Sequence, residues 1–67
     1  MAKIQLNGKK ISIKSNFSIQ DLLDKYKMVN KKVAIEHNGT IISKINYKKK
    51  YLRNGDKVEI VHFIGGG

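Results

Sequence analysis

The first quarter of the chain alternates apolar and polar residues in two short runs. Apolar residues stand at alternate positions on both sides of an Asn-Gly pair: Ile4, Leu6, Ile11 and Ile13. An Asn-Gly pair between such runs favours a hairpin, because a type I′ turn requires positive φ at both central residues. The pattern predicts antiparallel strands near residues 2–7 and 9–14, with one face covered and the other in solvent.

The next segment has the hydrophobic period of a helix. Its apolar residues stand at positions i, i+3, i+4 and i+7: Ile19, Leu22, Leu23 and Tyr26. Ser18 and Asp21 have the spacing of a capping box, and Phe17 stands where a hydrophobic staple would pack against the helix. These signals predict a helix over residues 18–28 that covers the apolar face of the hairpin.

The second half of the chain returns to short alternating runs. The strands predicted there cover residues 33–37, 41–42 and 57–63. Asn38-Gly39 predicts a tight turn between the first two, and Asn54-Gly55-Asp56 predicts a turn into the last. Residues 44–53 have no sustained period, which favours an irregular connection with a short helical turn.

The resulting element order, β-β-α-β-β-β, predicts the fold class. The first and last strands are the most apolar, so we expect both to lie centrally in one mixed sheet of four to five strands. One main helix across one face of such a sheet gives an α+β, ubiquitin-like β-grasp fold. We expect this domain over residues 1–64 and a flexible glycine tail over residues 65–67. Alternation leaves the neighbours of each strand open.

Composition excludes several classes of function. The chain of 67 residues has no Cys, so disulfides, thiolate metal sites and thiol catalysis are excluded. His37 and His62 have no Ser, Cys or His partner at a useful spacing, and the five acidic residues are scattered, so we expect neither a catalytic nor a metal site. No apolar run reaches the 18 or so residues of a membrane span. We expect a cytoplasmic protein, and the Lys, Asn and Ile content also permits a plastid-encoded protein of the stroma.

The net charge of +9 would attract nucleic acid, anionic membranes or acidic proteins. Residues 44–53 hold five basic residues together with Tyr47 and Tyr51. The two tyrosines could stack on bases, or they could anchor the loop to the core. Lysines also occur elsewhere along the chain, which favours a solvated basic surface over a nucleic-acid groove. A nucleic-acid partner is therefore not expected, and a small RNA-binding module is an alternative.

The sequence closes with a hydrophobic strand followed by Gly65-Gly66-Gly67. A frayed end is the simplest interpretation of such a tail. A strip without Cβ atoms can also thread a narrow tunnel in a partner and present its carboxylate there. A carboxylate is a poor electrophile until adenylation by ATP gives it a good leaving group. Combined with a β-grasp domain, the tail therefore favours a carrier whose terminus reacts on other proteins.

Over essentially its whole length, the chain resembles the ThiS family, the sulfur carriers of thiamine biosynthesis. Four stretches carry the resemblance: Ile4–Gly8, Asp21–Leu23, Val33–Gly39 and Asn54–Gly67. The ending Glu59–Gly67 is the most specific part, because a double glycine alone also occurs in ubiquitin-like modifiers and in the small subunit of molybdopterin synthase.

The resemblance implies a role for each residue of the tail. A ThiF-type adenylating enzyme would activate the carboxylate of Gly67 with ATP, and a cysteine-desulfurase relay would convert it to a thiocarboxylate. Thiazole synthase (ThiG) would then take the sulfur. Gly65 and Gly66 would thread into partners, and Phe63 and Ile64 would contact them. The chain itself would be neither an enzyme nor a cofactor-binding protein. A ubiquitin-like modifier conjugated to lysines is a further alternative.

Overall fold

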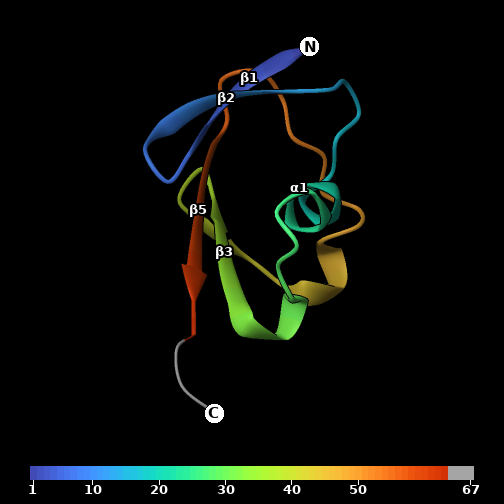
Figure 1. Cartoon of the computed structure of the whole chain (residues 1–67), viewed down its shortest axis with the longest axis vertical. Helices are drawn as coiled ribbons and strands as arrows, with labels where there is room; N and C mark the ends of the chain where they lie inside the picture. The colour runs from blue at the N-terminus through green and yellow to red at the C-terminus, as the bar shows by residue number, and fades with distance from the viewer. Residues whose placement is uncertain (64–67) are drawn as a thin grey trace.

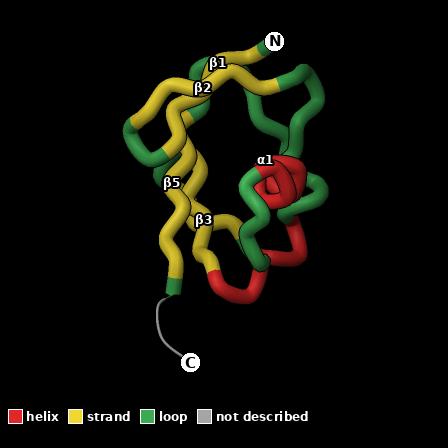
Figure 2. Tube along the Cα trace, viewed as in Figure 1, coloured by secondary structure: helices red, strands yellow, loops and turns green. Residues whose placement is uncertain are grey.

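Within residues 1–63, the part of the chain that the computed structural model describes, five strands form one mixed sheet and one α-helix crosses one of its faces (Figure 1). The strands are β1 (Ala2–Leu6), β2 (Lys9–Ile13), β3 (Val33–His37), β4 (Thr40–Ile42) and β5 (Lys57–His62). The helix is α1 (Ile19–Lys25), and two short 3₁₀ turns are η1 (Asn30–Lys32) and η2 (Lys44–Asn46). Figure 2 shows the loops and helical turns that surround α1.

The strand order is β2-β1-β5-β3-β4, with β1 parallel to β5 and every other neighbouring pair antiparallel. The predicted mixed sheet with the first and last strands as its central members is confirmed, and so is the β-grasp fold. Strand β5 lies in the middle of the sheet, and its alternate residues Val58 and Ile60 face α1 and are buried.

Both predicted hairpins are confirmed, and their turns have the expected backbone conformation. Asn7 and Gly8 have φ of 47° and 84°, and Asn38 and Gly39 have φ of 49° and 85°. Two consecutive residues with positive φ form the I′ turn that matches the twist of paired strands. The second turn pairs His37 with Thr40, so β4 begins one residue earlier than predicted.

The beginning of α1 is confirmed in detail. The Ser18 hydroxyl accepts a hydrogen bond from the Asp21 N–H at 3.0 Å, and an Asp21 carboxylate oxygen accepts one from the Ser18 N–H at 2.9 Å. These two bonds complete the capping box. The connection after η2 supplies two more acceptors, since its carbonyls bond the N–H groups of Ile19 and Gln20 at 2.9 and 3.0 Å.

The predicted end of the helix at residue 28 is wrong, because α1 ends at Lys25. Lys27 adopts a left-handed conformation with φ of 56°, its N–H bonds the Asp24 carbonyl, and the Met28 N–H bonds the Leu23 carbonyl. This pattern is a Schellman motif, which usually has glycine at the left-handed position. Tyr26, predicted to be in the buried stripe, stands at the helix end and is 40% exposed.

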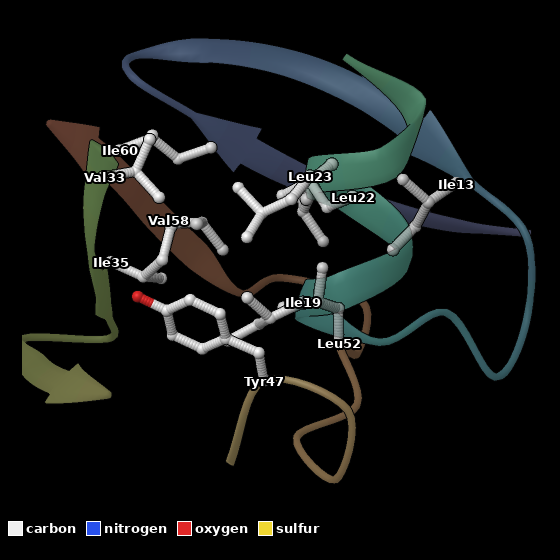
Figure 3. Packing of buried hydrophobic residues seen from close by; sticks show 11 residues of the cluster. Ile13, Ile19, Leu22, Leu23, Val33, Ile35, Tyr47, Leu52, Val58 and Ile60 are labelled. Carbon is white, nitrogen blue, oxygen red and sulfur yellow. The ribbon is translucent and has the colours of Figure 1, made fainter. Parts of the chain in front are cut away.

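The core lies between α1 and the sheet (Figure 3). Its buried residues are Ile4, Ile13, Ile19, Leu22, Leu23, Val33, Ile35, Tyr47, Leu52, Val58 and Ile60. Tyr47 is 1% exposed, and its ring lies between Ile35 and Ile19 in Figure 3, where burial raises the pKa of its hydroxyl. Tyr47 therefore anchors the irregular connection to the core and is not available to stack on a base.

Candidate functional site

Strand β5 leads to the residues for which sulfur chemistry is expected. Ile64 and the three glycines of the predicted tail, Gly65, Gly66 and Gly67, lie outside the described residues, so their roles stay predictions. Phe63 is the last described residue. Its side chain is 55% exposed, and its N–H donates to the Lys32 carbonyl at 2.8 Å. Figure 1 shows the arrowhead of β5 at the opposite end of the molecule from the N-terminus.

The side-chain amide of Asn7 holds β5 on the β1 side. Its Oδ1 accepts a hydrogen bond from the Ile60 N–H at 2.7 Å, and its Nδ2 donates to the Ile60 carbonyl at 3.2 Å. The Asn7 N–H also donates to the Val58 carbonyl at 2.9 Å. The amide therefore adds a hydrogen-bonded pair beyond the last residue of β1, where the backbone has already entered the turn.

Asn38 holds the beginning of β5 from the β3 side in a similar way. Its Oδ1 accepts from the Lys57 N–H at 2.8 Å, and its own N–H donates to the Lys57 carbonyl at 2.8 Å. The two turn asparagines thus fix the strand that precedes the tail. The sequence indicated their turn conformation, but their contacts with β5 depend on strand neighbours that the pattern of residues left open.

A partly buried polar network fixes the turn that leads into β5. One carboxylate oxygen of Asp56, Oδ2, accepts from the Arg53 N–H at 2.8 Å and lies 2.8 Å from His37 Nε2. The other oxygen accepts from Asn38 Nδ2 at 3.1 Å. Because an ionised carboxylate only accepts, His37 Nε2 is the donor in this pair. The pair was not predicted from the sequence, since its members are 19 residues apart and meet through strand pairing.

The environment of Asp56 sets the pKa of its carboxyl group. Burial alone would raise the pKa, but the bonds from His37, the Arg53 N–H and Asn38, together with attraction to His37, outweigh burial and lower it below its ordinary value. The side chains of His37 and Asp56 are 10% and 13% exposed. No cluster of three His, Asp or Glu residues that could hold a metal occurs in residues 1–63. The bonds of Asp56 to His37, Asn38 and the Arg53 N–H position the turn before β5.

The residues at the end of β5, Val61, His62 and Phe63, all have exposed side chains. Since Val58 and Ile60 face the helix, Glu59 and Val61 point to the other face, where Val61 is 57% exposed. Glu59 stands opposite Glu36 on β3. Glu36 and Glu59 thus lie toward the beginning of β5, and the exposed apolar side chains of Val61 and Phe63 lie at its end. The exposure of Phe63 is compatible with the partner contact that was predicted for it.

Basic side chains are spread over the molecule. Among residues 1–63, the one pair within salt-bridge distance is His37 and Asp56, so the lysines and Arg53 have no carboxylate partner in this part of the chain. Of the two tyrosines proposed for base stacking, Tyr51 is 53% exposed and Tyr47 is buried. This arrangement favours the solvated basic surface over the RNA groove. No helix in the described residues is long and apolar enough to cross a membrane.

Comparison with known proteins places the chain in one family. The model of the ThiS family matches residues 3–67. The sulfur carrier protein ThiS of Bacillus subtilis is 48% identical over 65 residues, which cover 96% of this chain and 98% of that protein. A thiazole synthase of Paramagnetospirillum magneticum is 37% identical over 65 residues, which cover 97% of this chain and 20% of the synthase.

A solved structure agrees with these sequence matches. The crystal structure of the thiamine biosynthesis protein ThiS from Geobacter metallireducens superposes with a TM-score of 0.82 at 26% identity, and the match covers 97% of this chain and 99% of that one. The family match includes the glycine tail. The chain belongs to the ThiS family.

Proposed function

We propose that this protein is a sulfur carrier for thiazole formation in thiamine biosynthesis, and that the carboxylate of Gly67 is the point where sulfur is attached. The observation that supports this function best is the end-to-end similarity to the Bacillus subtilis carrier, at 48% identity over 98% of its length. The family match over residues 3–67 includes all three glycines.

The chemistry begins with activation of the tail by a ThiF-type enzyme. The Gly67 carboxylate attacks the α-phosphorus of ATP and expels pyrophosphate, which leaves an acyl-adenylate. A persulfide sulfur from a cysteine-desulfurase relay then attacks the acyl carbon, and AMP departs. A second thiol cleaves the resulting acyl disulfide, forming a protein disulfide and releasing the thiocarboxylate. In this scheme ATP is bound by the activating partner, and the carrier binds no cofactor of its own.

Thiazole synthase is the acceptor that we propose for the sulfur. The similarity of this chain to one fifth of a thiazole synthase supports the pairing, because it joins a ThiS-like stretch and that activity in one polypeptide. The role of the carrier is to present the tail, not to catalyse. Strand β5, held by Asn7 and Asn38, supplies a fixed base for it. Gly65 and Gly66 thread into the partner, where Phe63 and Ile64 contact its surface. We place this chemistry in the cytoplasm.

Removal of Gly67 tests the attachment point. We expect the intact chain, incubated with a ThiF-type enzyme, ATP and a sulfur source, to gain the mass that corresponds to replacement of one carboxylate oxygen by sulfur. The chain without Gly67 should show no such gain, because the shortened tail does not reach the activating site. Intact-mass spectrometry measures both, and unfolding by urea checks that the two chains are equally stable.

Two results would contradict this proposal. An unchanged mass of the intact chain, under conditions that load a known carrier, would exclude a thiocarboxylate carrier. Normal loading of the shortened chain would place the sulfur elsewhere. Covalent adducts of Gly67 with lysines in a cell extract, without any thiocarboxylate, would instead identify a ubiquitin-like modifier.

A further inference from the structure

Strand β2 forms one edge of the sheet and presents unpaired backbone groups. The N–H of Gln5 on β1 donates to the carbonyl of Asp56, just before β5, and the N–H of Asn7, in the turn after β1, donates to the carbonyl of Val58 on β5. The intervening residues of β1 therefore direct their backbone toward β2. Because antiparallel partners alternate, the backbone groups of Lys10 and Ser12 point away from β1, toward the open edge. This edge therefore offers two N–H groups and two carbonyls to an additional strand.

A groove adjoins this edge on the face that α1 covers. It has a volume of about 420 Å³, and its lining includes Leu6, Lys9, Ile11, Tyr26, Met28 and Ile60. Most of these side chains are apolar, and Tyr26 is 40% exposed because α1 ends early. A strand added beside β2 would direct every second side chain to the same face as Ile11, and so into this groove.

The charge on β2 indicates which kind of strand could pair with this edge. Lys9 and Lys10 are exposed on the edge strand, and lysines on an edge disfavour pairing with a second copy of the same strand. The same two lysines attract a strand that carries carboxylates opposite them, because opposite charges on facing residues stabilise strand pairs. Edge, groove and charge together fit an extended peptide with apolar and acidic residues.

We propose that β2 is a docking site for an extended acidic segment of a partner protein, which joins the sheet as a sixth strand. This mode of recognition obtains affinity from backbone hydrogen bonds and specificity from side chains in alternate pockets. Strand β1 lies between β2 and β5, and Ile60 is the residue of β5 that contributes to the groove.

The pairing of β2 defines the sequence that the site recognises. In an antiparallel complex, the residue opposite Ile11 points into the groove and is apolar. The residues opposite Lys10 and Lys9 are acidic, and the residue opposite Ser12 is small and polar. Read in the direction of the bound peptide, the pattern is apolar, small polar, apolar, acidic, acidic, with the first residue opposite Ile13. The pentapeptide amide Val-Thr-Ile-Asp-Asp fits this pattern and is a suitable probe.

Titration of the full chain with this peptide, labelled with fluorescein at its N-terminus, tests the proposal. We expect saturable binding with Kd of about 100 μM, and protection of the Lys10 and Ser12 amides from hydrogen exchange. Lys10→Glu should weaken binding by about fivefold or more, since an attractive pair becomes repulsive. Lys49→Glu, which changes the net charge equally at the connection after η2, should leave binding within about twofold.

Variation of the peptide tests the backbone bonds without altering the protein. N-methylation of the aspartate opposite Lys10 removes one strand–strand donor and should weaken binding by about tenfold. Lack of saturation at peptide concentrations of about 1 mM would overturn the proposal. Equal losses with Lys10→Glu and Lys49→Glu, or displacement of the peptide by an RNA oligonucleotide that protects neither Lys10 nor Ser12, would also overturn it, because they indicate unspecific attraction to a basic surface. Exchange protection confined to β4 would place the docking site at the other edge.

Discussion

At the scale of single residues, the asparagines of the two turns do more than tolerate a positive φ. Asn7 has φ of 47° and also exchanges two hydrogen bonds with the backbone of Ile60 through its side chain. Lys27 has a similar φ of 56°, at the end of a helix where glycine is usual. Substitution at the two positions therefore separates two contributions to the free energy of unfolding: that of the left-handed backbone and that of the Asn7 side-chain hydrogen bonds.

Asn7→Gly keeps the turn conformation available but removes the amide that holds β5. We expect a loss of about 1–2 kcal/mol in the free energy of unfolding, because two partly buried hydrogen bonds disappear. Lys27→Gly is the matched control, and we expect it to gain about 0.5–1 kcal/mol by relieving the left-handed lysine. Urea unfolding measures both. Equal effects of the two glycines would mean that the Asn7 amide contributes nothing.

Asp56 gives the stability of the protein a specific dependence on pH. Its pKa is lowered in the folded state, so its contribution is complete above the ordinary value of about 4 and is lost as the pH falls through the folded pKa. We expect Asp56→Asn to lower stability by about 1–2 kcal/mol at pH 7, and this difference from the wild type to shrink below about pH 4. Urea unfolding between pH 7 and pH 3 would reveal a constant difference if Asp56 were not responsible.

At the scale of elements, α1 is a short helix whose first turn is stabilised by a capping box. Ser18 is 4% exposed, and its hydroxyl provides the capping bond to Asp21. We expect Ser18→Ala to lower the free energy of unfolding by about 1 kcal/mol. Ser15→Ala, at an exposed position before the helix, should have almost no effect. Thermal unfolding of both variants tests this, and a similar shift for the two would exclude a capping role.

Features that depend on a short stretch of residues could be predicted from the sequence. The two Asn-Gly hairpins, the capping box and the central position of the first and last strands are confirmed because each depends on a short pattern of residues. The end of α1 was not predictable, since nothing in the pattern marks Lys27 as left-handed. The contacts of Asn7 with Ile60 and of His37 with Asp56 were missed because they depend on which strands are neighbours.

The candidate site also has a part that could be predicted from the sequence and a part that could not. The tail residues could be proposed from the sequence, because glycines after a strand have a chemical use that does not depend on packing. The support for that tail could not be proposed, since Asn7 and Asn38 read as turn residues and their bonds to β5 form through the sheet. The docking edge also needed the structure, because it exists only where β2 lies outermost.

At the scale of the whole molecule, the net charge of +9 is the dominant electrostatic feature. The described part of the chain has no ion pair between a carboxylate and lysine or arginine, so the cations mainly repel one another. Raising NaCl from about 0.02 to about 0.5 M should therefore raise the midpoint of thermal unfolding by about 5 °C, because salt screens this repulsion. A double variant with Lys10→Glu and Lys49→Glu should respond less. An unchanged or lower midpoint in salt would contradict a repulsive surface.

The central position of β5 has a mechanical consequence for whatever is attached at its end. Strand β5 pairs with β3 along five residues and with β1 on its other side, and Asn7 reinforces it at Ile60. A force applied at Phe63 along the strand is directed across these hydrogen bonds, so they bear the load together and do not open one after another. A pull on Phe63 is therefore resisted by the sheet as a unit.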